Sequence, residues 1–187
     1  MNIFYLDSNV IRCAAYHCDK HIVKMILEYA QLLSTAHRVL DGLPYRSVTS
    51  AGRRLTRYRL DDPRESLLYK ATHANHPSAV WVRQSPQHYT WLHDLLQAVC
   101  HEYTRRYRKT HKVERTGLLT ALAPHPVMIP THLASVPPPL AMPDDCKTSD
   151  HVLAYRRYYR HHKRTLAQWR YSQVPTWFTA AEEMPHE

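Results

Sequence analysis

Hydrophobic residues recur at helical spacing over most of the chain, and several of these stretches start at residues typical of helix N-termini. Two starts combine a capping side chain with a proline at the first helical position, at Asp62-Pro63 and at Ser85-Pro86. The first of these also carries Glu65 at the third helical position, which completes a capping box. The expected helices cover residues 10–40 with a break near Cys18, 62–73, a short segment from 77, 85–108 and 150–170.

The segments between these helices are of two kinds. Residues 43–62 are polar, and we expect a loop there. Residues 116–143 contain no charged residue and seven prolines, and their apolar side chains favour an ordered loop that packs on the body. The sequence therefore predicts a mainly α, single-domain bundle of four or five helices with a long Pro-rich ordered loop.

Composition narrows the fold and the chemistry. The 187 residues suffice for one domain, and only three of them are glycine. This scarcity excludes the glycine-rich loops that bind dinucleotides or nucleotide phosphates, and it disfavours an all-β fold. Four cysteines without a close pair, and no recognisable signal peptide, indicate reduced thiols in the cytoplasm. No apolar run is long enough to span a membrane.

One narrow face of the first long helix is polar. On a helical wheel the six residues of this polar stripe fall within about 80°. They are His17, His21, Lys24, Glu28, Gln31 and Thr35. Because apolar residues fill most of the remaining circumference, we expect the stripe to line a cleft, where Lys24 and Glu28 pair. The alternative is a solvated helix edge between two packed flanks.

The polar stripe supplies the candidate catalytic residues, and loops supply further pocket candidates. The catalytic candidates are His17, His21, Lys24 and Glu28. The pocket candidates are Asp19, Gln31, Asn75, His76 and Asp144. Cys13, His17 and His21 also step by four residues, as zinc ligands on a helix do. With no H-E-x-x-H motif present, we predict neither a metal nor a cofactor.

The charge of the chain favours a polyanionic partner. Lysine and arginine outnumber aspartate and glutamate by 25 to 16, a net charge of +9. The basic residues gather in three clusters, and tyrosines are interleaved with those of the final helix, as suits phosphate contact and base stacking. The nucleic-acid-binding candidates are Arg53, Arg54, Arg57, Arg83, Arg105, Arg106, Arg156, Arg157, Arg160 and Lys163. DNA is the expected partner, and no protein partner is identifiable.

Two segments resemble the small all-α pyrimidine-dimer DNA glycosylases of phages and bacteria, the endonuclease V-like group. Residues 17–25 are similar to that family's early helix, with a histidine pair and a methionine, and residues 102–112 resemble its acidic, double-arginine, histidine-lysine segment. Other segments resemble small phage proteins, and a phage origin would place the protein in the cytoplasm of a bacterial host. The resemblance implies base excision, in which the terminal amine attacks the sugar C1′, forms a Schiff base and is assisted by a helix glutamate.

The sequence departs from that pattern at both reacting groups. Lys24 aligns with the family's glutamate, and Asn2 favours retention of Met1. A desolvated Lys24 could itself serve as the amine nucleophile, with Glu28 as acid or base.

The leading interpretation is a phage-like DNA glycosylase, with or without lyase activity. Two alternatives remain open. One is a transferase that modifies thymine or cytosine in phage DNA, and the other is a non-catalytic nucleic-acid-binding module.

Overall fold

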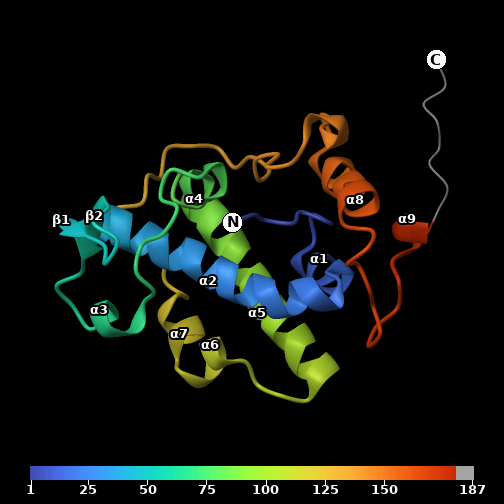
Figure 1. Cartoon of the computed structure of the whole chain (residues 1–187), viewed down its shortest axis with the longest axis horizontal. Helices are drawn as coiled ribbons and strands as arrows, with labels where there is room; N and C mark the ends of the chain where they lie inside the picture. Colours follow the sequence, from blue (N-terminus) through green and yellow to red (C-terminus); the bar gives the residue numbers. More distant parts are fainter. Residues whose placement is uncertain (180–187) are drawn as a thin grey trace.

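Two long helices form the centre of the protein in a computed structural model that describes residues 1–179. Helix α2 packs against α5, α1 packs beside it on α5, and α4 covers α2 (Figure 1). A small hairpin lies at one end of α2, and α8 lies beyond the other end. The α-helices are α1 (Val10–Tyr16), α2 (Asp19–Asp41), α3 (Arg64–Leu67), α4 (Pro77–Val82), α5 (Pro86–Tyr107), α6 (Lys112–Arg115), α7 (Leu118–Ala121), α8 (His151–His162) and α9 (Thr176–Thr179). The strands are β1 (Leu43–Val48) and β2 (Arg54–Arg59), and a 3₁₀ turn, η1, covers Asp144–Cys146.

The main helices begin and end where their capping residues dictate. Asn9 caps α1 by accepting hydrogen bonds from the backbone N–H groups of residues 11 and 12. Ser85 caps α5 in the same way, one residue before Pro86. The break near Cys18 is confirmed, because His17 closes α1 in an extended conformation and α2 begins at Asp19.

The mainly α single-domain prediction is confirmed, and α2 is the helix around which the core forms. Its apolar side chains are buried on most sides of the helix, against α5 on one side and α4 on another. No helix in the described part of the chain is long and apolar enough to cross a membrane.

The segment that was expected to be a loop at 43–62 is instead an antiparallel hairpin, so that expectation is wrong. Tyr45 lies opposite Arg57, and Leu43 lies opposite Arg59. The turn closes at Gly52, whose positive φ of 76° suits glycine. Polar residues occupy both faces of the hairpin, so the alternation of apolar and polar residues that marks a half-buried strand is missing.

The helix predicted over 62–73 is also wrong in its length, since α3 ends at Leu67. Arg38 is responsible for part of this. Its buried guanidinium donates to the backbone carbonyls of Glu65, Leu68 and Tyr69, which would otherwise serve a continuing helix. The final helix likewise stops at His162 and does not reach residue 170.

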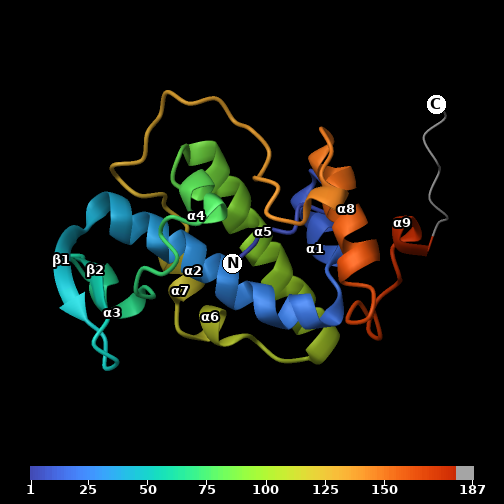
Figure 2. The same cartoon turned by 45° about the horizontal axis from the view of Figure 1, so that its top comes forward.

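The uncharged segment after α7 packs along the body and reaches α8 (Figure 2). The Trp81 indole donates to the carbonyl of Val136, and the Val136 N–H donates to His88. Near its end, the carbonyl of Ala141 accepts a hydrogen bond from the side chain of Asn2. The segment therefore brings residues 136–141 beside the start of the chain.

Candidate active site at the chain N-terminus

The structure separates the polar stripe into a buried part and an accessible part. His17 and His21 are buried, while Glu28 has a side chain that is 13% exposed. Lys24 is 64% exposed and its ammonium lies 3.1 Å from a Glu28 carboxylate oxygen. The expected Lys24–Glu28 pair is therefore present, but the expectation of a desolvated Lys24 is wrong.

The two histidines are held by buried hydrogen bonds. The Nδ1 of His17 lies 2.7 Å from the Cys13 carbonyl, so it carries the proton, and Nε2 accepts from the Tyr29 hydroxyl at 2.7 Å. His21 bonds the Tyr159 hydroxyl through Nδ1. Burial lowers the pKa of His17 to about 4 and that of His21 to about 3. Both rings are therefore neutral at pH 7.

The metal arrangement considered for Cys13, His17 and His21 is not formed. The Cys13 thiol donates to the carbonyl of Phe4, and both ring nitrogens of His17 already have partners. Within residues 1–179 a different group has ligand atoms close enough to hold a metal, with all separations within 4.8 Å. It consists of Asp145, Cys146 and His162, at η1 and the end of α8.

The α-amino group of Met1 lies next to Glu28. Its nitrogen is 3.9 Å from the second carboxylate oxygen of Glu28, and the Met1 side chain is only 4% exposed. The structure thus brings together one buried chain end, one half-buried carboxylate and one exposed ammonium group. This cluster lies near the middle of the molecule, where Figure 1 marks the N-terminus.

Asn2 fixes the direction of the chain at this point. Its amide nitrogen donates to the Ala141 carbonyl at 2.9 Å, and its amide oxygen accepts from the N–H of Ile3 at 2.8 Å. The Tyr155 hydroxyl shares its proton between that oxygen, at 2.9 Å, and the carbonyl of Pro139. Sequence reasoning did not single out Met1, Asn2 or Tyr155 as site residues, because no local motif marks their meeting.

His76, in the segment between α3 and α4, lies near the amine, and His73 lies near His76. The pKa of His76 is lowered, first by burial and then by the positive charges of the N-terminus and His73, whereas the charge of Glu28 raises it. His76 also caps α4 by accepting from the N–H of Ser78. Asn75, a predicted pocket residue, lines a cavity beside them.

The other pocket candidates have different surroundings. Asp19 is buried and binds the Arg106 guanidinium at 3.1 Å, so it stabilises the fold. Asp144 is 94% exposed and pairs with Lys147, so it lines no pocket. Gln31 is partly buried on α2, one turn beyond Glu28.

Three of the arginines predicted to contact nucleic acid are held by partners within the protein. The Arg106 side chain is fully buried between Asp19 and Glu102. Arg83 donates to the carbonyls of Ala74 and Ala79. Arg156 donates to the carbonyl of Leu6 and pairs with Asp7.

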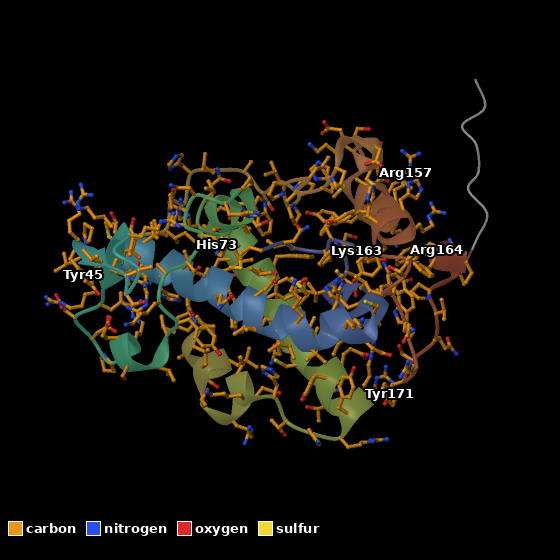
Figure 3. The ribbon with its side chains drawn as sticks, viewed as in Figure 1. Tyr45, His73, Arg157, Lys163, Arg164 and Tyr171 are labelled. Carbon is orange, nitrogen blue, oxygen red and sulfur yellow. The ribbon has the colours of Figure 1, made fainter. Side chains whose placement is uncertain are left out.

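The remaining basic candidates lie closer to the surface. Arg105 pairs with Glu102, and Lys163 lies over the ring of Tyr158. Figure 3 shows His73, Lys163 and Arg164 along the long axis of the molecule, with Tyr45 on the hairpin at one end. The other basic candidates are exposed or partly buried, and they lie on the hairpin and on α8: Arg53, Arg54, Arg57, Arg157 and Arg160.

Comparison of the sequence with known protein families identifies the family of this chain. Residues 1–115 match a family model described as pyrimidine dimer DNA glycosylase. The chain belongs to this family. No curated protein and no solved structure matches it.

Membership of the pyrimidine dimer DNA glycosylase family confirms the resemblance seen in the sequence and makes DNA the substrate. The matched region includes Met1, Glu28 and the hairpin. It ends before Ala141 and Tyr155, the two residues that hold Asn2 from outside the match.

Proposed function

We propose that this protein excises bases at pyrimidine dimers in DNA, and that the α-amino group of Met1 is the nucleophile. The observation that carries the proposal is the 3.9 Å separation between this amine and Glu28, at a chain end whose side chain is buried. The family match over residues 1–115 supports the substrate.

The environments of the two candidate amines favour Met1 over Lys24. The Met1 side chain is only 4% exposed, and its amine nitrogen lies 3.9 Å from a Glu28 carboxylate oxygen. Lys24 is 64% exposed, and nothing desolvates it. We assign Lys24 the role of an accessory positive charge beside Glu28.

Glu28 is placed to move protons during the reaction. The amine nitrogen forms a bond to C1′ as the bond from C1′ to the base breaks, and the base leaves with that electron pair and takes up a proton. Transfer of a proton from the nitrogen to the sugar O4′ opens the ring and leaves a protonated Schiff base. A carboxylate next to the amine can accept and return these protons. Elimination from the Schiff base would then give lyase activity.

The decisive experiment traps the Schiff base with borohydride on ultraviolet-irradiated duplex DNA, followed by peptide mapping. We expect the adduct on Met1 in the wild type and in Lys24→Arg. An added alanine before Met1 keeps an α-amine but shifts it by about 3.8 Å, and we expect it to lose the adduct.

Other outcomes of this trapping experiment identify other mechanisms. An adduct on Lys24 would restore the lysine nucleophile. Cleavage of the C1′–base bond without any adduct would make water the nucleophile. Binding without base release would favour the transferase or the non-catalytic binding module.

A further inference from the structure

The hairpin collects arginines that have no acidic partner. Within residues 1–179 no ion pair is formed by Arg46, Arg53, Arg54 or Arg57. Elsewhere the arginines commonly pair with carboxylates, as Arg38 does with Glu65 at 2.6 Å. Arg53 and Arg57 line the same cavity, where their positive charges repel one another and favour an anion supplied from outside.

The hairpin is firmly attached to the body although it contributes little to the core. The buried Arg38 guanidinium donates to the Tyr58 carbonyl at 3.1 Å, and Glu65 accepts from the N–H of Leu60. Leu43 and Tyr45 are nonetheless about half exposed. An isolated two-stranded hairpin is only marginally stable in water. Anchoring at its base therefore holds an exposed basic element in a fixed position.

A cavity of about 590 Å³ lies between β2 and residues 71–75. Its wall on the hairpin side includes Arg53 and Arg57, and its other wall includes Thr72, His73 and Asn75. His73 has a φ of 49°, a conformation that is uncommon for residues other than glycine and that clusters at functional sites. The cavity thus combines cationic groups with neutral hydrogen-bonding groups.

The position of the cavity relative to the amine is set by α2. Thr72 exchanges hydrogen bonds with Thr35, through its N–H at 3.2 Å and its carbonyl at 3.3 Å. Thr35 lies seven residues, or two turns, beyond Glu28 on the same helix, a rise of about 10 Å. One strand of DNA advances about 3.4 Å per nucleotide, so this offset corresponds to roughly three nucleotides. Figure 3 shows His73 between the hairpin and the middle of the molecule.

We propose that this cavity binds the phosphodiester backbone of one DNA strand, on one side of the attacked nucleotide and two to four nucleotides from it. Arg53 and Arg57 bind the phosphate, and His73 and Asn75 contact the adjoining sugar-phosphate. The inference rests on the proposed function only in placing the reacting sugar at Met1. Phosphate contacts carry no base information, so the site would be indifferent to sequence.

The test asks whether one arginine side chain and one phosphate of the DNA contact each other. A set of duplexes, each with one dimer and one neutral methylphosphonate linkage at a different position, is titrated against wild type, Arg57→Ala and Arg59→Ala. Arg59 is a matched control, because it lies on the same strand but pairs with Asp61 and does not line the cavity. Arg53→Ala, in the hairpin turn, is a second test variant.

We expect a neutral linkage two to four nucleotides to one side to weaken wild-type binding about ten-fold, as loss of a charge-assisted hydrogen bond does. In Arg57→Ala the same linkage should not weaken DNA binding further. The slope of log affinity against log salt concentration should fall in magnitude by about one. Arg59→Ala should respond like the wild type.

Three results would overturn the proposal. The first is that the neutral linkage weakens DNA binding by the same factor in Arg57→Ala, in Arg53→Ala and in the wild type. The second is an equal loss of binding in Arg59→Ala. The third is tight binding of thymidine monophosphate alone that Arg57→Ala abolishes, which would identify a site for free nucleotides. DNA binding requires no turnover. If Arg57→Ala still abolishes the effect of the neutral linkage while no adduct is trapped, only the proposed amine chemistry is refuted.

Discussion

The two halves of the polar stripe on the first long helix contain similar residue types in very different surroundings. His17 and His21 are enclosed among aromatic rings and buried hydroxyl groups, and burial lowers the pKa of both rings. Glu28 lies two turns beyond His21 on α2, beside a chain end and partly open to solvent. From this difference we expect the buried histidines to stabilise the fold and the accessible carboxylate to be the group that can meet substrate.

The largest expected effect concerns the accessible half. Glu28→Gln is nearly isosteric but cannot exchange a proton, so we expect turnover to fall at least 100-fold, within the range for loss of a general acid–base. Single-turnover cleavage of the C1′–base bond in dimer-containing duplexes, read as strand breaks after alkali treatment, measures this. The free energy of unfolding should change by no more than about 1 kcal/mol. Activity within three-fold of the wild type would remove Glu28 from the reaction.

The buried half is expected to affect stability and not chemistry. The folded-state pKa values of His17 and His21 are lowered to about 4 and 3, so the unfolded chain binds protons first as the pH falls below 6.5. Stability is therefore full above about pH 7 and is lost from pH 6.5 downwards. Between pH 7 and 5.5 we expect a loss of about 1 kcal/mol per histidine.

Urea titrations at several pH values measure this loss. His17→Gln should be less stable at pH 7 and should show a shallower pH dependence. Trapping by the folded fraction of His17→Gln should equal that of the wild type. A lower rate per folded molecule would give the buried half a catalytic role.

A smaller effect is expected from the contact that orients the amine. Tyr155→Phe removes the hydroxyl shared by Asn2 and Pro139, so we expect the rate of adduct formation at saturating DNA to fall about ten-fold. DNA affinity should be unchanged. Tyr159→Phe is the matched control, because it removes a buried hydroxyl from the same helix that contacts His21 and not Asn2. Equal rates in the two variants would reduce Tyr155 to a packing residue.

The fold was largely predictable from local signals, and the site only in part. The spacing along α2, the break at Cys18 and the Ser85-Pro86 start all reflect interactions within a few residues. The shortened helix at 64–67 reflects Arg38, which approaches from 27 to 31 residues away. The burial of Arg106 likewise depends on Asp19, 87 residues distant. The spacing of apolar and polar residues along a helix carries no information about contacts this distant in the sequence.

The candidate site shows the same division. The Lys24–Glu28 pair follows from helical spacing, and it is present. The meeting of Met1 with Glu28 depends on how the first residues cross α2, which local sequence does not encode. The polar stripe therefore identified the carboxylate and its lysine partner, and missed the second amine beside it, that of Met1.

The hydrogen bond between Asn2 and Tyr155 has a consequence for when the protein becomes active. The two residues are separated by 153 positions, so Asn2 must wait for α8 to be synthesised before it gains this partner. At about 5 to 20 residues per second, the start of the nascent chain waits roughly 8 to 30 s for this partner. An unfinished polypeptide on the ribosome already carries Met1 and Glu28, but it lacks the residues that hold the amine in place. On the proposed mechanism, synthesis of α8 is thus the step that supplies the Asn2 contact and orders the Met1 amine.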